Sequence, residues 1–276
     1  CGIFGISNHA DSAALVALGL HALQHRGQEG CGIVSFDGKN YHSEKRQGLV
    51  GDHFTNPETI KKLPGNFAIG HNRYSTTGET SLRNIQPFFA DLHMGGLSVA
   101  HNGNLTNALL LRETLVKDGA IFRTTSDTET IVQLIAKSKR EKFVDKLIDT
   151  LFQIQGGYSL VLMTNKKLVG VRDPYGIRPL VIGKLKDSYV FSDSNSVIRK
   201  SFDELPEHVK ENIFGSVYVN LDMQEIESLD KKIASLGWEV GSGMPPRDDT
   251  GLAWDHDWTT IAAARIDETP DNENDF

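Results

Sequence analysis

The apolar residues of the chain recur with two periods, which separates expected strands from expected helices. Short apolar runs that end at glycine, asparagine or aspartate predict strands, and apolar residues spaced three or four positions apart predict helices. Strands are expected within 1–6, 66–75, 95–104, 158–164, 167–173, 180–185, 188–193 and 215–221. Helices are expected at 13–25, 107–119, 126–139 and 142–154. A hairpin is expected over 30–46, with Asp37 and Gly38 in its turn.

The order of these segments indicates the class of fold. Consecutive short strands joined by tight turns favour antiparallel pairing over repeated strand–helix–strand units. The expected helices are grouped before and between the blocks of strands. The sequence therefore predicts a layered α+β domain.

The composition changes near residue 230. All six tyrosines precede this point and all three tryptophans, at 238, 254 and 258, follow it. We therefore expect one domain over 1–230 and a divergent, partly disordered extension over 231–276 that ends in an acidic tail. The tryptophans either form an interface patch or pack back onto the domain, and the neighbouring Asp-His-Asp at 255–257 is a poor metal site because adjacent residues rarely converge on one ion.

Composition and charge narrow the possible partners. The chain has 276 residues and a net charge of −7, which argues against a nucleic-acid surface. No apolar run approaches the ~18 residues of a membrane helix and no secretory segment is evident, so a cytoplasmic location is expected. The two cysteines, Cys1 and Cys31, are too few for a disulfide framework. Neither a metal site nor a cofactor site is evident.

Cys1 places a thiol and a free α-amine on one residue. An α-amine has a pKa of about 7.7–8.0, so a useful fraction is neutral near pH 7. It can therefore act as general base for its own side chain, directly or through a water. The alternative is an arbitrary first residue, left by methionine removal or by the choice of chain boundary. Taken alone, that alternative is the simpler one.

Two polar segments offer groups of opposite charge. Arg73, in HNRYSTTG at 71–78, follows an expected strand and suits two-pronged binding of a carboxylate. Asp127, in SDTET at 126–130, could pair with a substrate ammonium. The structural alternatives are a surface salt bridge for the arginine and a helix cap for the aspartate.

Three other segments each have a structural and a chemical interpretation. Asn102 and Gly103, in AHNGNLTN at 100–107, can donate hydrogen bonds to an oxyanion or form an ordinary Asn-Gly turn. Arg26 and Gly27 follow the first expected helix, where capping is the simpler explanation. The segment 171–180 contains two prolines and a glycine, which indicates a rigid turn.

The combination of these groups is more informative than any one of them. An arginine and an aspartate can bind the carboxylate and ammonium of a free amino acid. A thiol with oxyanion donors can attack an amide further along the same molecule. Glutamine fits both requirements.

The motifs resemble those of a known family, the glutaminase domain of class II glutamine amidotransferases within the N-terminal nucleophile hydrolases. Within it they are most similar to the phosphoribosylpyrophosphate amidotransferase branch. The resemblance rests on seven motifs in the family's order, CGIFGI, HRGQEG, HNRYSTTG, AHNGNLTN, SDTET, GGYSLVLM and RDPYGIRPL. The asparagine synthetase branch differs, since it typically has lysine at the position of Arg178. The resemblance implies a four-layer αββα sandwich of two antiparallel sheets.

The resemblance also implies roles for individual residues. Cys1 would be the nucleophile, freed by removal of methionine or a short propeptide, and would form a γ-glutamyl thioester. Asn102 and Gly103 match the oxyanion hole. The positions that match substrate-binding or site-lining residues are Arg73 (α-carboxylate), Asp127 (α-ammonium), Arg26, Tyr74 and Thr76.

The expected partners are L-glutamine and an ammonia-accepting domain or subunit, with a homo-oligomer possible. In this branch the acceptor is phosphoribosyl diphosphate, in the first step of purine synthesis. We find no phosphoribosyltransferase signature, because the paired acids of RDDTG at 247–251 lack a preceding strand and a phosphate loop, and Mg²⁺ would be expected only with such a site. The segment FSDSNSVI at 191–198 also departs from the family, which we interpret as a tolerated loop change.

Two alternatives stay open. One is another Cys1 amide hydrolase, acting for example on N-acyl amides, although such an enzyme needs no pair like Arg73 and Asp127. The other is a stand-alone or regulatory glutaminase-like module with a different acceptor or partner.

Overall fold

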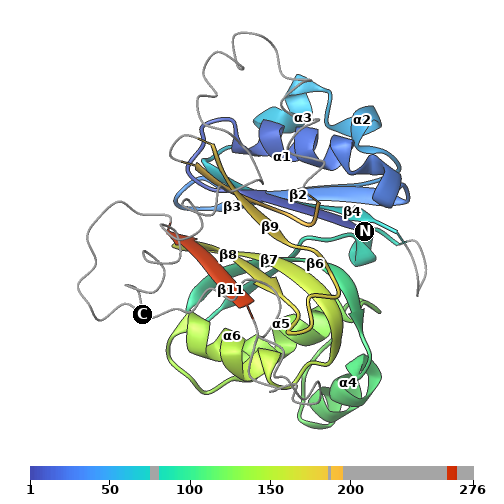
Figure 1. The fold of residues 1–276 in the computed structure, drawn as a ribbon, viewed down its shortest axis with the longest axis vertical. Coiled ribbons are helices and arrows are strands. Elements are labelled where there is room, and N and C mark those ends of the chain that lie inside the picture. Colours follow the sequence, from blue (N-terminus) through green and yellow to red (C-terminus); the bar gives the residue numbers. More distant parts are fainter. Residues whose placement is uncertain (75–80, 186–187, 195–259, 266–276) are drawn as a thin grey trace, which may run out of the picture.

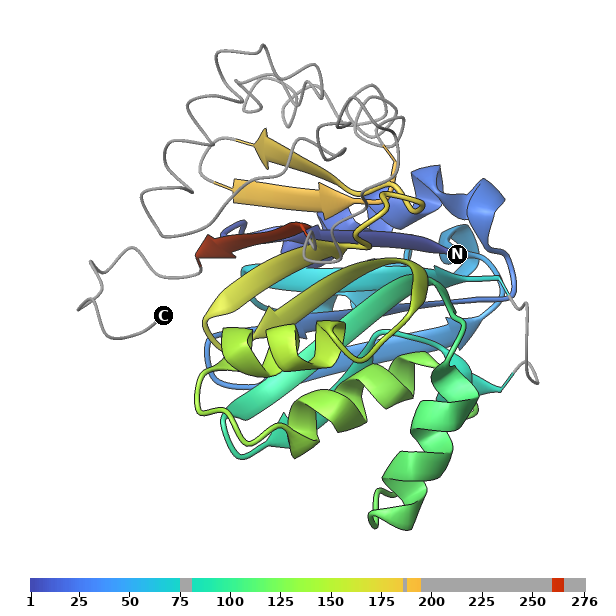
Figure 2. The ribbon, with the colours of Figure 1, turned by 60° about the horizontal axis from the view of Figure 1, so that its bottom comes forward.

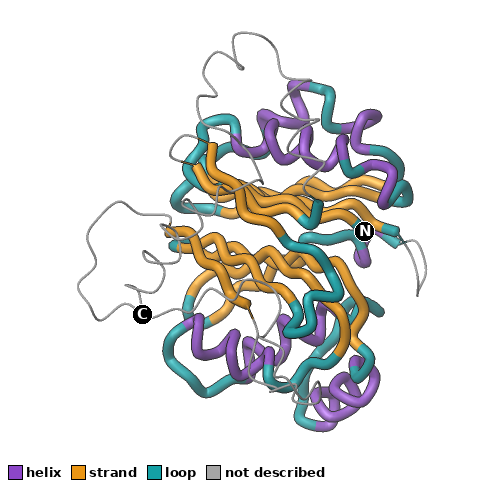
Figure 3. The backbone as a smooth tube through the Cα atoms, in the orientation of Figure 1, coloured by secondary structure: helices purple, strands orange, loops and turns teal. Residues whose placement is uncertain are grey.

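Two antiparallel sheets lie face to face with helices on both outer sides (Figures 1 and 3). The structure, a computed structural model, describes residues 1–74, 81–185, 188–194 and 260–265. The layers follow the order helix, sheet, sheet, helix. The predicted α+β class and the αββα sandwich are therefore confirmed.

The first sheet has six strands in the order β3-β2-β4-β1-β10-β9. Their bounds are β1 Gly2–Ile6, β2 Gly30–Phe36, β3 Tyr41–Gln47, β4 Phe67–Arg73, β9 Val181–Leu185 and β10 Ser188–Ser192. The register aligns Gly2 of β1 with Asn72 of β4, and Gly30 of β2 with Arg73. Cys1, one residue before β1, therefore lies beside the end of β4.

The second sheet has the order β11-β8-β7-β6-β5. Its bounds are β5 Phe88–Leu92, β6 Gly95–Leu105, β7 Gly156–Thr164, β8 Lys167–Arg172 and β11 Thr260–Arg265. β11, red in Figure 1, pairs with β8 and comes from the segment expected to be an extension. Part of that segment thus completes an edge of the second sheet. Neither β5 nor β11 was predicted from the sequence.

The helices cover the outer faces of both sheets. Those next to the first sheet are α1 Ser12–Ala22, α2 Val50–His53 and α3 Pro57–Lys61, and those next to the second are α4 Ala108–Lys117, α5 Thr128–Lys137 and α6 Phe143–Leu151. α5 and α6 lie side by side across the second sheet, and α4 projects beyond them (Figure 2). The short helices α2 and α3 are too brief for a helical period to predict.

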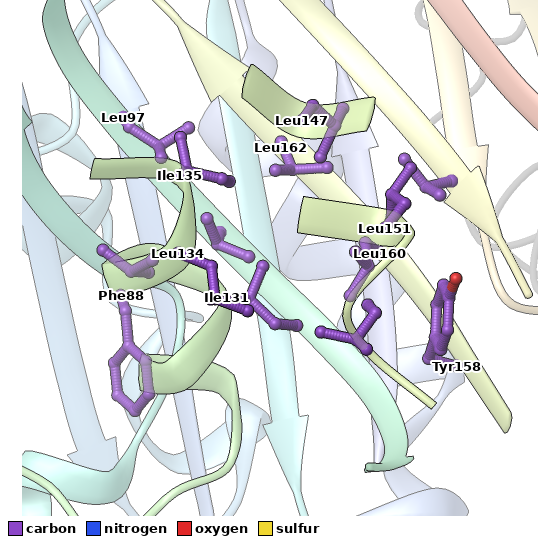
Figure 4. Packing of buried hydrophobic residues seen from close by; sticks show 14 of the residues in the cluster. Phe88, Leu97, Ile131, Leu134, Ile135, Leu147, Leu151, Tyr158, Leu160 and Leu162 are labelled. Atoms are coloured by element: carbon purple, nitrogen blue, oxygen red, sulfur yellow. The ribbon is translucent and has the colours of Figure 1, made fainter. Parts of the chain in front are cut away.

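Apolar side chains fill three layers of core. The first layer lies between the second sheet and its helices (Figure 4). There, Leu160 and Leu162 of β7 pack against side chains of α5 and α6, among them Ile131, Ile135 and Leu147. A second layer joins α1 to the first sheet. A third lies between the two sheets. Strands β1 and β2 are buried on both faces, so they appear in the sequence as near-continuous apolar runs, whereas β3 and β5 are partly exposed.

Local sequence signals place most element ends well. The turn after β2 is stabilised by the Asp37 carboxylate, which accepts from the backbone N–H groups of Lys39 and Asn40 at 2.8 and 2.7 Å. The first helix stops earlier than predicted, at Ala22, and a 3₁₀ helix, η1, continues from Gln24 to Arg26.

A predicted strand at 215–221 and the predicted domain boundary at 230 lie outside the described residues. No helix of the described part is long and apolar enough to cross a membrane.

Candidate active site

The N-terminal residue lies between the two sheets, close to the ends of several strands (Figure 1). The α-amino group of Cys1 donates a 2.8 Å hydrogen bond to the carbonyl oxygen of Arg26. The Cys1 thiol lies 3.5 Å from the carbonyl oxygen of Tyr74. The residue is partly buried, and these two contacts hold its amine and thiol beside the end of β4.

Burial lowers the pKa of the Cys1 α-amine from 8.0 to about 6. The positive charges of Arg26 and Arg178 lower this pKa further, whereas the negative charges of Asp193 and Glu29 raise it. With a pKa of about 6, the neutral amine outnumbers the ammonium about ten to one at pH 7. A neutral amine that donates one N–H to a carbonyl keeps its lone pair, so it can accept the thiol proton.

Gly27 brings the loop that follows η1 against the end of β4. Its φ of −171° is extended, so it is not the left-handed residue of a helix C-cap. A Cβ at this position would lie 2.8 Å from the carbonyl oxygen of Arg73. The missing side chain therefore permits the approach that joins Arg26, Cys1 and Arg73.

Arg73 is buried rather than exposed, with 6% of its surface accessible. Its Nη1 donates to the carbonyl oxygen of Asn84 at 3.1 Å, and its buried Nε has no protein hydrogen-bond partner. Burial lowers the pKa of the guanidinium, and the charges of Glu29 and Asp127 oppose this change. The surface salt bridge considered from the sequence is thus not what Arg73 forms. A buried cation with a free donor suits a substrate carboxylate.

Asp127 stands at the N-terminus of α5, but its side chain makes no capping hydrogen bond. Its Oδ2 accepts from the backbone N–H of Leu105 at 3.0 Å, and its Oδ1 lies 3.7 Å from Nδ1 of His101. Burial lowers the pKa of His101, which favours the neutral ring. The carboxylate is 23% exposed, so it has lone pairs available to a ligand.

A short segment before β5 connects the surroundings of Arg73 to those of Asp127. The Asn84 amide exchanges two hydrogen bonds with Thr125, at 3.0 and 3.1 Å. The Gln86 amide donates to Thr128 at 3.0 Å and accepts from the backbone N–H of His101 at 2.7 Å. Hydrogen bonds of this segment therefore link Arg73 to the start of α5, where Asp127 lies.

Asn102 and Gly103 lie within β6 and pair with Ser159 and Tyr158 of β7, so they do not form a hairpin turn. Gly103 has a φ of +154°, and a Cβ there would lie 2.2 Å from the carbonyl oxygen of Gly157. A glycine is therefore required at this close approach of the two strands.

The Asn102 side chain is almost fully buried, with 1% exposed, and is held at both polar ends. Its Nδ2 donates to Oδ2 of Asp193, and its Oδ1 accepts from Nη2 of Arg178. Asp193 also lies 3.6 Å from Nη1 of Arg26, which donates to the Asp193 carbonyl oxygen at 2.9 Å. One network therefore joins Asn102 to the residue whose carbonyl orients the Cys1 amine.

The loop that carries Arg178 is organised by one buried carboxylate. Asp173 accepts four backbone hydrogen bonds, from Tyr158 at 3.3 Å, Tyr175 at 3.1 Å, Ile177 at 3.0 Å and Arg178 at 2.9 Å. The rigid turn predicted over 171–180 thus has a specific cause, and it fixes the backbone from which Arg178 extends.

The sequence-predicted residues are brought together to different degrees. Hydrogen bonds or mutual charge effects link Cys1, Arg26, Arg73, Asn102 and Asp127, and Gly103 follows Asn102 directly. Tyr74 contributes its carbonyl oxygen, since the side chain is 59% exposed. Thr76 lies outside the described residues.

Sequence reasoning missed three residues of this site: His101, Arg178 and Asp193. Arg178 carried a signal, because the family resemblance marks that position as differing between branches. Asp193 lies in the segment interpreted as a tolerated loop change, and no local pattern indicated a buried carboxylate there. Within the described residues, no group of three or more His, Cys, Asp or Glu side chains is placed to hold a metal ion.

Comparison with known proteins identifies similar sequences. Residues 71–200 match the family described as "Glutamine amidotransferase domain". An amidophosphoribosyltransferase of Rhizobium etli is 58% identical over 191 residues, which are 69% of this chain and 38% of that protein. A chloroplastic amidophosphoribosyltransferase of Glycine max is 43% identical over 230 residues, which are 83% of this chain and 40% of that protein. The chain thus spans about two fifths of the length of these relatives.

Solved structures give the same result at the level of the fold. A glutamine phosphoribosylpyrophosphate amidotransferase from B. subtilis, complexed with ADP and GMP, superposes with a TM-score of 0.69 at 40% identity. The match covers 73% of this chain and 43% of that one. A second structure, described as the allosteric regulatory enzyme of purine biosynthesis, has a TM-score of 0.70 at 40% identity with the same coverage.

Proposed function

Since the chain carries a glutamine amidotransferase domain of class II, we propose that it hydrolyses the side-chain amide of L-glutamine and supplies the ammonia to an acceptor. The observation that carries this proposal is the lowered pKa and fixed position of the Cys1 α-amine. Its α-amine has a pKa of about 6, is oriented by the Arg26 carbonyl oxygen and belongs to the same residue as the thiol. The base and the nucleophile are therefore both ready at neutral pH.

The chemistry proceeds in two steps. The Cys1 amine accepts the thiol proton as sulfur attacks the amide carbon, and the proton passes to the departing nitrogen, which leaves as ammonia. A water then attacks the resulting thioester, with the amine again as base, and gives glutamate and the free thiol. Asn102 Nδ2 and the backbone N–H of Gly103 are the proposed donors to the oxyanion that forms in each step.

Substrate selection follows from the two charged groups. The Arg73 guanidinium has a buried Nε free to donate to the glutamine α-carboxylate, and the partly exposed Asp127 carboxylate can accept from the α-ammonium. Tyr74, Arg26 and Thr76 are proposed to line the site, Arg26 through the carbonyl that holds the Cys1 amine. A zwitterion clamp of this kind favours a free amino acid over an N-acyl amide.

The proposed acceptor is phosphoribosyl diphosphate, bound by a phosphoribosyltransferase domain or subunit, in the first step of purine synthesis. The support is the name shared by the relatives, amidophosphoribosyltransferase. The proposal includes a glutaminase domain over 1–230 and a cytoplasmic location. The net charge of −7 is the reason for excluding a nucleic-acid partner. Ammonia is mostly protonated in water at neutral pH and would escape, so the proposal includes a shielded path from the glutaminase site to the coupled acceptor site.

Glutamate release from glutamine tests the first half of this proposal. Wild-type chain with Cys1 as its first residue should release glutamate and take up one equivalent of a diazo-ketone glutamine analogue, measured by intact mass. Cys1→Ala should lose both. Cys31→Ala is the matched control, because Cys31 is buried and its pKa is raised to about 12, so its thiol is unreactive.

Two outcomes would contradict the proposal. The absence of an adduct on a correctly processed Cys1 would exclude the thiol as nucleophile. Equal hydrolysis of glutamine and of an N-acyl amide would exclude the zwitterion clamp. The acceptor is tested separately, by following phosphoribosylamine formation when phosphoribosyl diphosphate is added with and without a phosphoribosyltransferase domain.

A further inference from the structure

The Asn102 amide is held between two groups of opposite charge that come from distant parts of the chain. Asp193 lies 91 residues away in sequence and accepts from Nδ2, and Arg178 lies 76 residues away and donates to Oδ1. Asp193 follows β10 in the first sheet, whereas Asn102 lies in β6 of the second. The contact therefore joins the two sheets at the site.

Only one orientation of the amide satisfies both neighbours. A guanidinium can only donate and an ionised carboxylate can only accept. A flipped Asn102 would place its NH₂ group against the Arg178 guanidinium, so that two donors face each other. The Arg178 contact alone therefore excludes the flip, although burial raises the pKa of Asp193. The charges of this chain therefore specify which end of the amide is the NH₂ group.

The contacts of Asn102 with Asp193 and Arg178 leave one of its Nδ2 hydrogens without an acceptor. An amide nitrogen carries two hydrogens, and Asp193 accepts one of them. The planar amide then fixes the direction of the other, because both hydrogens lie in the plane set by the two contacts. Oxyanion stabilisation depends on donors aimed in advance at the position where charge develops.

We propose that Arg178 and Asp193 are positioning residues that hold Asn102 so that its second Nδ2 hydrogen points to the oxyanion. This inference rests on the proposed glutamine hydrolysis. The two residues act by orienting Asn102, and neither contacts the substrate in this proposal. Asp193 is completely buried, and Arg178 extends from a loop held by the Asp173 carboxylate, so both ends of the clamp are rigid.

The single variants are Arg178→Met, which keeps the aliphatic stem without the donor, and Asp193→Asn, which keeps the shape without the charge. Removal of one oxyanion donor costs about 100- to 1000-fold in kcat, so a donor that stays but is badly aimed should cost about 10- to 100-fold. The KM for glutamine should hold within about twofold, because Arg73 and Asp127 are untouched. Arg178→Lys keeps a charged donor and should recover part of the lost kcat.

The decisive comparison uses Asn102→Ala as a background. Once the asparagine amide is absent, nothing remains for Arg178 to orient. At pH 8 the Cys1 amine stays neutral even though loss of the Arg178 charge raises its pKa, so at that pH adding Arg178→Met should change kcat by less than about twofold. Arg140→Met is the matched control. Arg140 is exposed and forms an ion pair with Asp149 of α6, so its replacement should leave kcat and KM unchanged.

The results separate the inference from the function on which it rests. If the wild type hydrolyses glutamine but Arg178→Met lowers kcat equally with and without Asn102, the positioning role is overturned alone. The same holds if KM rises while kcat stays constant. If the wild type releases no glutamate, the proposed function fails and this inference fails with it. Circular dichroism of every variant identifies a loss of fold, and Arg178→Lys then carries the comparison.

Discussion

The α-amino group of Cys1 donates a 2.8 Å hydrogen bond to the carbonyl oxygen of Arg26. Burial lowers the pKa of this amine to about 6, and the contact with Arg26 orients the amine beside its own thiol. Cys1 therefore carries both the nucleophile, its thiol, and the base, its α-amine.

The first prediction concerns pH. Because the neutral amine is the base and its pKa is lowered to about 6, kcat/KM for glutamine should be constant near pH 7–8 and fall about tenfold per unit below pH 6. Glu29→Gln removes a negative charge that raises this pKa, so the midpoint should move to lower pH. A midpoint near 8, the ordinary value for an α-amine, would contradict the prediction.

The second prediction concerns the first residue itself. One alanine added before Cys1 converts the amine into an amide with no basic lone pair. Since general-base catalysis contributes about 10²–10⁴-fold, hydrolysis should fall at least 100-fold. An aminopeptidase that removes the added residue, monitored by intact mass, should restore the activity of the same sample. An extended chain that remains fully active would exclude the α-amine as base.

The third prediction concerns the Arg73 guanidinium. Arg73→Lys keeps the charge but loses the planar pair of donors, so KM for glutamine should rise about 10- to 100-fold with a smaller change in kcat. Steady-state kinetics measures both. Arg140→Lys, at an exposed ion pair, is the control and should leave both parameters unchanged. A lowered kcat with the wild-type KM would assign Arg73 to the chemical step instead.

The fourth prediction concerns the close approach at Gly27. A Cβ in Gly27→Ala would lie 2.8 Å from the Arg73 carbonyl oxygen, so the loop must move away from β4. Because this loop carries the Arg26 carbonyl, kcat/KM should fall about tenfold or more, since small misplacements of catalytic groups are costly. Gly51→Ala has only ordinary contacts, at 3.6 Å or more, and should retain activity.

The fifth prediction concerns stability. Asp173 accepts four backbone hydrogen bonds, and Asp173→Asn replaces one accepting oxygen by an NH₂ group that faces backbone donors. The free energy of unfolding should fall on the order of 3 kcal/mol, because buried donors lose their acceptor. Urea denaturation measures the change. Asp91→Asn, at an exposed carboxylate of β5, should change the stability little.

The sequence predicted the regular elements of the first 194 residues well, apart from β5 and the short helices. Strands β1 and β7 contain apolar runs with clear ends, and α4, α5 and α6 keep a helical period, whereas β6 continues through the polar residues at 101–104 that were expected to start a loop. Such signals are local, so they need no knowledge of the neighbours. β11 was missed because TIAAAR forms a strand by pairing with β8, and nothing within six residues indicates that pairing.

Among the site residues, the sequence identified those whose chemistry is visible in the residue type. Cys1, Arg73, Asn102, Gly103 and Asp127 were all selected with a structural alternative beside them, and three of those alternatives are now excluded by contacts. Arg73 is buried, the Asn102–Gly103 pair lies within a strand, and Asp127 makes no capping bond.

By itself, then, the sequence determined the order of strands and helices and the presence of a thiol, an arginine, an aspartate and an amide in recognisable motifs. Only the tertiary structure decided the pKa of the Cys1 amine, the orientation of the Asn102 amide and the position of Asp193. The physical reason is that burial, close backbone approach and charge pairing depend on segments that are far apart in the chain. A pattern read along the sequence carries no distance between residues 102 and 193.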